Sequence, residues 1–168
     1  MFLTVTDTLG CKDVDSVNVN IASLTATSSS DVTICKGHIT QLTAGGGTDY
    51  TWFPSYGLSD TNVYDPLATP DTTTTYKVEV SDGACYDTTT VTVYVNDVTA
   101  DAGVDDTICP GNSIQLNASG GSGYQWSPTS VSNINIADPI ASPNSTTTYT
   151  VNISDTMGCM DTDSVTIT

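Results

Sequence analysis

Cysteine and aspartate are the residue types of this sequence that could carry chemistry. The five cysteines among its 168 residues are Cys11, Cys35, Cys85, Cys109 and Cys159. The first, third and fifth follow one another at intervals of 74 residues, and the second and fourth are also 74 residues apart. Thiols form disulfides or bind zinc, but zinc sites usually combine C-x-x-C pairs with histidines. The sequence has no C-x-x-C and only one histidine, His38, so it does not favour a zinc site.

Aspartates provide a second candidate chemistry, because hard carboxylate oxygens suit calcium. The candidate calcium ligands are Asp101, Asp105, Asp106 and Asp155. No D-x-D-x-D-G loop is present, which excludes the EF-hand form. The competing interpretation is that these residues form turns and keep the surface soluble. Apart from this candidate calcium, no cofactor is expected.

Catalysis is not expected from this chain. A single histidine and the absence of G-x-S-x-G leave no nucleophile and base to pair. We therefore predict no catalytic residues and no enzymatic activity.

The charge balance excludes two classes of partner. Lys and Arg together number 3 and Asp and Glu 19, for a formal net charge of −16. Such a surface repels the phosphates of nucleic acids and anionic membranes. The apolar runs are only a few residues long, so membrane insertion is not expected either.

A repeated hairpin pattern must position these residues. The stretch Thr146–Cys159 recurs at Thr73–Cys85, and its tail occurs again at Leu3–Cys11. Each copy is an alternating run, a turn with Asp and Gly, a cysteine and a second alternating run, which is typical of a β-hairpin. The repeat predicts three segments. They are 1–22, the closing hairpin of a truncated preceding repeat, and two full repeats at 23–97 and 98–168.

Within each full repeat the signals predict an all-β fold. Short alternating runs are separated by glycine or proline turns every 8–12 residues, which is typical of a sandwich of about seven strands with essentially no helix. Trp52 and Trp126 occupy equivalent positions, and so do Tyr76 and Tyr149. A repeated tryptophan could form a platform on which sugars stack, but one tryptophan per repeat at the same place favours a core residue, whose burial stabilises by about 2–4 kcal/mol. The repeated tyrosines are also interpreted as core residues.

The repeated motifs resemble a known family. They include DVTICKG at 31–37 and DDTICPG at 105–111, followed by YTWFP at 50–54 and YQWSP at 124–128. This pattern is similar to the Ig-like, PKD-like repeats of large, type IX-secreted surface proteins of gliding bacteria, among them gliding-motility adhesins. The resemblance implies tandem Ig-like (PKD-like) sandwiches in an extracellular protein at the cell surface.

The function implied by this resemblance is a structural stalk or adhesion module. Its partners would be adjacent repeats of the same chain, a surface polysaccharide or another surface protein. One alternative is a carbohydrate-binding accessory module of a secreted enzyme, which would expose Phe53, Tyr56 or Tyr64 on one face. Another is a subunit of a polymerising filament, in which strands from another chain complete the first repeat.

Because the resemblance implies export, the cysteines are expected to form disulfides. We expect pairing within repeats, as Cys35–Cys85 and Cys109–Cys159 with Cys11 unpaired, since each full repeat then carries its own bridge. Pairing across the junctions, as Cys11–Cys35 and Cys85–Cys109, is a second register, and Cys35–Cys159 belongs to a third. The two turns of one repeat could also lie at opposite poles of a sandwich, too far apart to bridge.

The resemblance also implies O-glycosylation of Ser or Thr that follows Asp and precedes an apolar residue or Thr. The candidates are Thr8, Ser16, Thr72, Thr88, Thr107, Thr156 and Ser164. The competing explanation is that Asp and Thr are abundant and that the repeats multiply their chance pairings.

Overall fold

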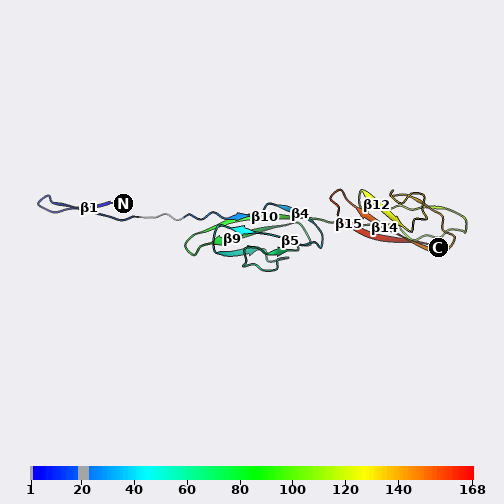
Figure 1. The fold of residues 1–168 in the computed structure, drawn as a ribbon, viewed down its shortest axis with the longest axis horizontal. Coiled ribbons are helices and arrows are strands. Elements are labelled where there is room, and N and C mark those ends of the chain that lie inside the picture. Colours follow the sequence, from blue (N-terminus) through cyan, green and yellow to red (C-terminus); the bar gives the residue numbers. More distant parts are fainter. Residues whose placement is uncertain (1, 19–22) are drawn as a thin grey trace. The chain divides into compact units, whose positions relative to one another are not determined.

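The computed structural model describes residues 2–18 and 23–168, which form strands joined by loops (Figure 1). No helix occurs in these residues, and therefore none that is long and apolar enough to cross a membrane. The strands are β1 (Phe2–Thr6), β2 (Lys12–Ser16), β3 (Thr27–Ser28), β4 (Val32–Cys35), β5 (Thr40–Gln41), β6 (Ala44–Gly45), β7 (Asp49–Phe53), β8 (Leu67–Ala68), β9 (Thr74–Ser81), β10 (Tyr86–Asn96), β11 (Ile114–Gln115), β12 (Gly123–Ser127), β13 (Ile140–Ala141), β14 (Thr147–Ser154) and β15 (Met160–Ile167). The predicted all-β fold of Ig-like sandwiches is confirmed.

The first two strands form an antiparallel hairpin. β1 pairs with β2 from Phe2 opposite Ser16 to Thr6 opposite Lys12. Residues 2–18 are exposed throughout, and even Leu3 keeps 66% of its surface accessible. The structure thus has a hairpin at Phe2–Ser16, whereas the assignment of 1–22 to a truncated preceding repeat stays a prediction, and residues 1 and 19–22 lie outside the described part of the chain.

The sequence repeat at 23–97 contains a four-stranded sheet in the order β4-β10-β9-β7. β4 runs parallel to β10, with Val32 opposite Val93, whereas β7 is antiparallel to β9. Two short pairs, β3-β6 and β5-β8, complete the strands of this repeat. The exposed-buried alternation along β9 follows the two-residue period of a strand with one face in the core.

The sequence repeat at 98–168 contains a three-stranded sheet in the order β12-β14-β15 and the short pair β11-β13. β14 and β15 are antiparallel from Thr147 opposite Ile167 to Ser154 opposite Met160. A parallel bridge joins Asp106 to Ile167, at the place where β4 pairs with β10 in the preceding repeat. The two repeats therefore share one topology.

Contacts between Cα atoms divide the chain into two compact units. One consists of Met1–Ser30, Gln41–Leu67 and Tyr76–Val91, and the other of Asp31–Thr40, Ala68–Thr75 and Thr92–Thr168. The predicted boundaries after residues 22 and 97 describe the periodicity of the sequence, and as domain boundaries they stay predictions.

Both tryptophans lie in the cores of their repeats, each with 1% of its surface exposed. The indole N–H of Trp52 donates to the carbonyl of Val63 at 2.9 Å, and that of Trp126 donates to the carbonyl of Ile136 at 3.0 Å. A buried indole N–H without a partner would cost free energy, so these bonds allow the ring to be buried completely.

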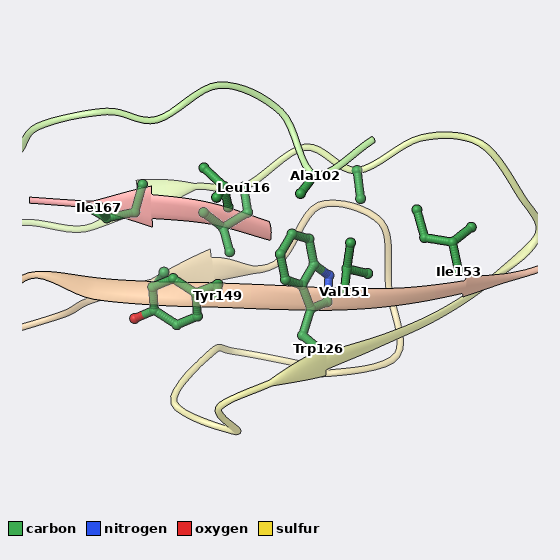
Figure 2. Close-up of a cluster of buried hydrophobic side chains, with 10 residues drawn as sticks. Ala102, Leu116, Trp126, Tyr149, Val151, Ile153 and Ile167 are labelled. Carbon is green, nitrogen blue, oxygen red and sulfur yellow. The ribbon is translucent and has the colours of Figure 1, made fainter. Parts of the chain in front are cut away.

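Figure 2 shows the core of the repeat at 98–168. Tyr149, Val151 and Ile153 stand at alternate positions of β14 and are fully buried, and Trp126 is the β12 residue opposite Val151. The remaining members of this cluster of buried residues are Ala102, Leu116, Ala118, Ala141, Val165 and Ile167. Through Val165 and Ile167 this core anchors the C-terminal half of β15.

Candidate functional site

A disulfide joins Cys35 to Cys159, across 124 residues of sequence. Cys35 is the last residue of β4, and Cys159 immediately precedes β15. Their Cα atoms are 5.4 Å apart, within the range that a disulfide requires. Both cysteines belong to the second compact unit, and Cys159 is buried, with 4% of its surface exposed.

The expected pairing of Cys35 with Cys85 is wrong. Cys35 lies opposite Asn96, the last residue of β10, whereas Cys85 precedes Tyr86, the first residue of the same strand. At about 3.3 Å per residue, the length of β10 separates the two cysteines by about 35 Å. A disulfide tolerates a Cα separation of only about 7 Å at most.

The expected pairing of Cys109 with Cys159 is wrong for the same reason. The N–H of Ile108 donates to the carbonyl of Thr168 at 2.9 Å, which places Cys109 beside the end of β15. Cys159 stands before the start of that strand, about 30 Å away at the usual rise per residue. The third register, Cys35–Cys159, is the one found.

The other three cysteines lie outside this bridge. Cys11 and Cys109 carry exposed free thiols, and Cys85 is half-buried.

An open pocket of about 390 Å³ lies beside the disulfide in the second compact unit. At its edge the Lys36 Nζ is 2.6 Å from Asp97 Oδ2. The hydrogen bond and the charge of Asp97 raise the pKa of the Lys36 amine above its ordinary value. Asp71 and Asp161 also line this pocket, so its wall carries more carboxylates than amines.

Asp155 organises the loop that presents Cys159. One carboxylate oxygen, Oδ1, accepts the N–H groups of Met157 at 2.8 Å and Cys159 at 2.9 Å, and the other accepts the side-chain amide of Asn96. Desolvation raises the pKa of Asp155, but these donors outweigh it and hold the pKa below its ordinary value. The role of Asn96 was not predicted, because no motif of the sequence distinguishes it.

Three of the four candidate calcium ligands, Asp101, Asp105 and Asp106, lie in the segment between β10 and β11, and Asp155 lies in the turn between β14 and β15. Each of their carboxylates accepts at least one backbone N–H. The pairs are Asp101 with Gly103, Asp105 with Thr166, Asp106 with Thr107, and Asp155 with Met157 and Cys159. Within residues 2–18 and 23–168, no group of three or more His, Cys, Asp or Glu side chains is arranged to hold a metal ion. Calcium binding therefore stays a prediction, and the observed role of these carboxylates is to hold loops.

The candidate O-glycosylation residues are all exposed. They are Thr8, Ser16, Thr72, Thr88, Thr107, Thr156 and Ser164. Ser16, Thr88 and Ser164 lie on strands, and the other four lie in turns or loops. Their exposure is compatible with modification, which itself stays a prediction.

Three aromatic side chains named for carbohydrate binding are exposed in the repeat at 23–97. Phe53 exposes 54% of its surface, Tyr56 50% and Tyr64 57%. Phe53 follows the buried Trp52 on β7, so its side chain points to the opposite face of the sheet. The ring of Tyr64 contacts that of Tyr50, with centroids 6.4 Å apart.

No protein-family model matches the chain, and no curated protein sequence does. Solved structures with a similar fold include tandem Ig domains. The titin domains Z1Z2 in complex with telethonin are 14% identical, with 88% of this chain and 97% of that chain covered and a TM-score of 0.35. Extracellular domains 3–5 of Drosophila OTK are 9% identical, with 99% and 69% covered and a TM-score of 0.43. A C-terminal fragment of intimin in complex with the intimin-binding domain of its receptor Tir is 18% identical, with 85% and 63% covered and a TM-score of 0.45. At these scores the similarity assigns no function.

Proposed function

We propose that this chain is a structural stalk and adhesion module of an extracellular repeat protein at a bacterial cell surface. The observation that carries the proposal is the Cys35–Cys159 disulfide, which spans a sequence separation of 124 residues and closes a loop containing the strands β5–β14 of the two repeats. Disulfides persist in oxidising surroundings, and exported proteins meet such surroundings. Its partners would be adjacent repeats of the same chain, a surface polysaccharide or another surface protein.

The proposed mechanism is mechanical. When the two ends of the chain are pulled, the covalent bond carries the tension past residues 36–158, so this part of the chain is not stretched, whereas β15 and the segment before Cys35 lie outside the loop and bear the load. The net charge of −16 makes neighbouring stalks repel one another at low salt. Such a module would keep its length under load.

Force spectroscopy of the single chain tests this mechanism. With the disulfide intact, unfolding should release only the residues outside the loop. After reduction, the additional 124 residues should add about 450 Å of extension, at about 3.6 Å per residue. The Cys35→Ser variant should show the longer extension without a reductant, and Cys109→Ser should match the parent. Full extension of the oxidised parent would contradict the mechanism.

The proposed location has its own test. Antibodies raised against residues 98–168 should label intact cells of the source organism, and mild protease treatment of those cells should remove the label. Labelling that requires permeabilised cells would refute a position at the cell surface. An antibody to a cytoplasmic protein of the same cells serves as the control for intactness.

Binding of carbohydrate is a second candidate function, favoured by the exposure of Phe53, Tyr56 and Tyr64. Aromatic faces bury a large apolar area when a ligand stacks on them. The repeat at 98–168 has small residues at the corresponding places, namely Ser127, Ser130 and Ala137.

Affinity electrophoresis through gels containing soluble polysaccharides tests this second function. The parent chain should be retarded, and the triple variant Phe53→Ser, Tyr56→Ser, Tyr64→Ala should migrate as in a plain gel. The variant copies residues that the chain already uses in its other repeat, so the fold should tolerate them. Equal migration of the parent in all gels would remove this candidate and leave the structural one.

A further inference from the structure

Two exposed thiols, Cys11 and Cys109, stand where the bridged cysteines stand in other copies of the repeat. Cys11 occupies the hairpin turn that Cys159 occupies between β14 and β15. Cys109 follows the strand segment that corresponds to β4, which ends at Cys35. One chain therefore carries an unbridged equivalent of each cysteine in the Cys35–Cys159 bridge: Cys109 corresponds to Cys35, and Cys11 corresponds to Cys159.

The local geometry at Cys11 matches that at Cys159. Asp7 Oδ1 accepts the N–H of Cys11 at 2.9 Å, and Asp155 Oδ1 accepts the N–H of Cys159 at the same distance. The glycine before each cysteine has a positive φ, 88° in the first loop and 86° in the second. Both loops thus present the cysteine from a backbone of the same conformation.

The local geometry at Cys109 matches that at Cys35. The carbonyl of Cys35 accepts the N–H of His38 at 3.0 Å, and the carbonyl of Cys109 accepts the N–H of Asn112 at 3.1 Å. The glycine two residues after each cysteine has a φ of 79° and 86°, respectively. The turn that follows the bridged cysteine is therefore already formed at the unbridged one.

We propose that Cys109 of one copy of this chain forms a disulfide with Cys11 of a second copy, in the pairing that Cys35 and Cys159 show. The contact is head-to-tail, because it joins Cys109 of one copy to Cys11 of the next. Each linked series of copies therefore keeps one unbridged Cys11 and one unbridged Cys109, and further copies can be added. This inference goes beyond the proposed stalk function and does not depend on it.

The bond forms by thiol–disulfide exchange with an oxidised dithiol or glutathione disulfide. The thiolate of Cys109 attacks the glutathione disulfide, forms a mixed disulfide and releases one reduced glutathione. The thiolate of Cys11 in the second copy then attacks the protein sulfur and releases the second. Two protein thiols lose two electrons and two protons in total, and one glutathione disulfide takes them up as two thiols.

Cys85 is a weaker candidate for the same role. Its loop places Asp82 three residues before the cysteine, whereas Asp7 stands four residues before Cys11. The thiol of Cys85 is also half-buried, and that of Cys11 is exposed. The pairing is therefore assigned to Cys11.

Oxidation of the full chain with glutathione disulfide, at a salt concentration that screens the mutual repulsion of acidic copies, tests the proposal. Non-reducing electrophoresis should show a ladder of monomer, dimer and longer multimers. Mass spectrometry of non-reduced peptides should find Cys109 linked to Cys11, with Cys35–Cys159 retained. A chain that stays monomeric after oxidation, or multimers linked through Cys85, would overturn the proposal.

Two serine variants test the direction of the contact. Cys11→Ser and Cys109→Ser should each remain monomeric when oxidised alone, because each lacks one half of the bridge. Their mixture should give a dimer that grows no further, linked from Cys109 of the first variant to Cys11 of the second. Dimers formed by either variant alone, through two like cysteines, would show unspecific oxidation and refute the assignment.

Discussion

The carboxylate of Asp161 accepts the backbone N–H of Ala100 at 2.8 Å. In the preceding repeat, Asp87 accepts the N–H of Ala26 at 2.9 Å, across the same sequence separation of 61 residues. Each bond ties the segment that leads into a repeat to the last strand of that repeat. The aspartates that follow each hairpin turn therefore hold the sandwich together, in addition to charging its surface.

This tie predicts acid sensitivity. The hydrogen bond from Ala100 holds the pKa of Asp161 below its ordinary 3.8, and the bond from Ala26 does the same for Asp87. A lowered pKa in the folded state contributes stability that is present above pH 3.8 and is lost as the pH falls through the lowered value. The melting temperature should therefore be steady at neutral pH and decline below about pH 4.

The variant Asp161→Asn isolates this effect. It should melt below the parent at pH 7, and the difference should shrink as the pH falls, since the asparagine does not titrate. The control is Asp13→Asn in the hairpin, whose carboxylate accepts the adjacent N–H of Val14. A difference between Asp161→Asn and the parent that is the same at every pH would contradict the assigned role.

Two equivalent tyrosines predict opposite responses to one substitution. The hydroxyl of Tyr76 donates to the carbonyl of Tyr56 at 2.8 Å, whereas the buried hydroxyl of Tyr149 has no hydrogen-bond partner among the described residues. Tyr76→Phe should destabilise the chain by about 1 kcal/mol, because it removes a satisfied buried bond. Tyr149→Phe should be neutral or stabilise it by up to about 1 kcal/mol, because it removes an unsatisfied group.

Denaturant unfolding measures both variants on the same scale. Tryptophan fluorescence is a suitable signal, since each repeat has one buried tryptophan. Equal losses in the two variants would mean that Tyr149 has a partner in solution.

Two glycines with positive φ should lose unequal amounts of stability when they are replaced by alanine. Gly120 has a φ of 118°, and a Cβ there would meet the carbonyl oxygen of Thr99 at 1.9 Å. Gly111 has a φ of 86° and open space around its Cβ position. Gly111→Ala should cost about 1 kcal/mol for its backbone conformation alone. Gly120→Ala adds a clash with backbone and should cost about 3 kcal/mol or more.

Thermal melting of the two alanine variants compares them directly. Gly120→Ala should lower the melting temperature more than Gly111→Ala does. Gly46→Ala should behave like Gly120→Ala, because a Cβ there would meet the carbonyl oxygen of Thr25 at 2.1 Å. Equal losses at Gly111 and Gly120 would show that the close approach of the backbone has no energetic consequence.

The disulfide predicts a loss of stability on reduction. Removing a native bridge typically costs about 2–5 kcal/mol, and the chain-entropy model places long loops at the upper end. Cys35→Ser should therefore lower the midpoint of denaturant unfolding under oxidising conditions, and should make it insensitive to dithiothreitol. Measured on the monomeric fraction, Cys109→Ser is the matched control, since this exposed cysteine lies outside the Cys35–Cys159 bridge. An unchanged midpoint in Cys35→Ser would contradict the prediction.

Much of the fold could be predicted from the sequence. The 74-residue repeat, the alternation around Tyr149 and Val151 and the matched positions of Trp52 and Trp126 identify strands and core without knowledge of their partners. Local patterns suffice here because the side chains of a strand alternate between its two faces, so the buried side is visible in the order of residues.

The sequence by itself determined the repeat, the strands and the aromatic core of this protein, because those follow from periodicity and residue type. Only the tertiary structure decided the cysteine pairing. A disulfide requires two Cα atoms within a few ångströms, and this depends on which pole of a sandwich each cysteine reaches. Cys35 lies beside the last residue of β10, and Cys85 directly precedes its first residue. The length of this strand therefore keeps the two cysteines of one repeat apart. Sequence spacing does not record that distance, and so the bridge from Cys35 to Cys159 became evident only in three dimensions.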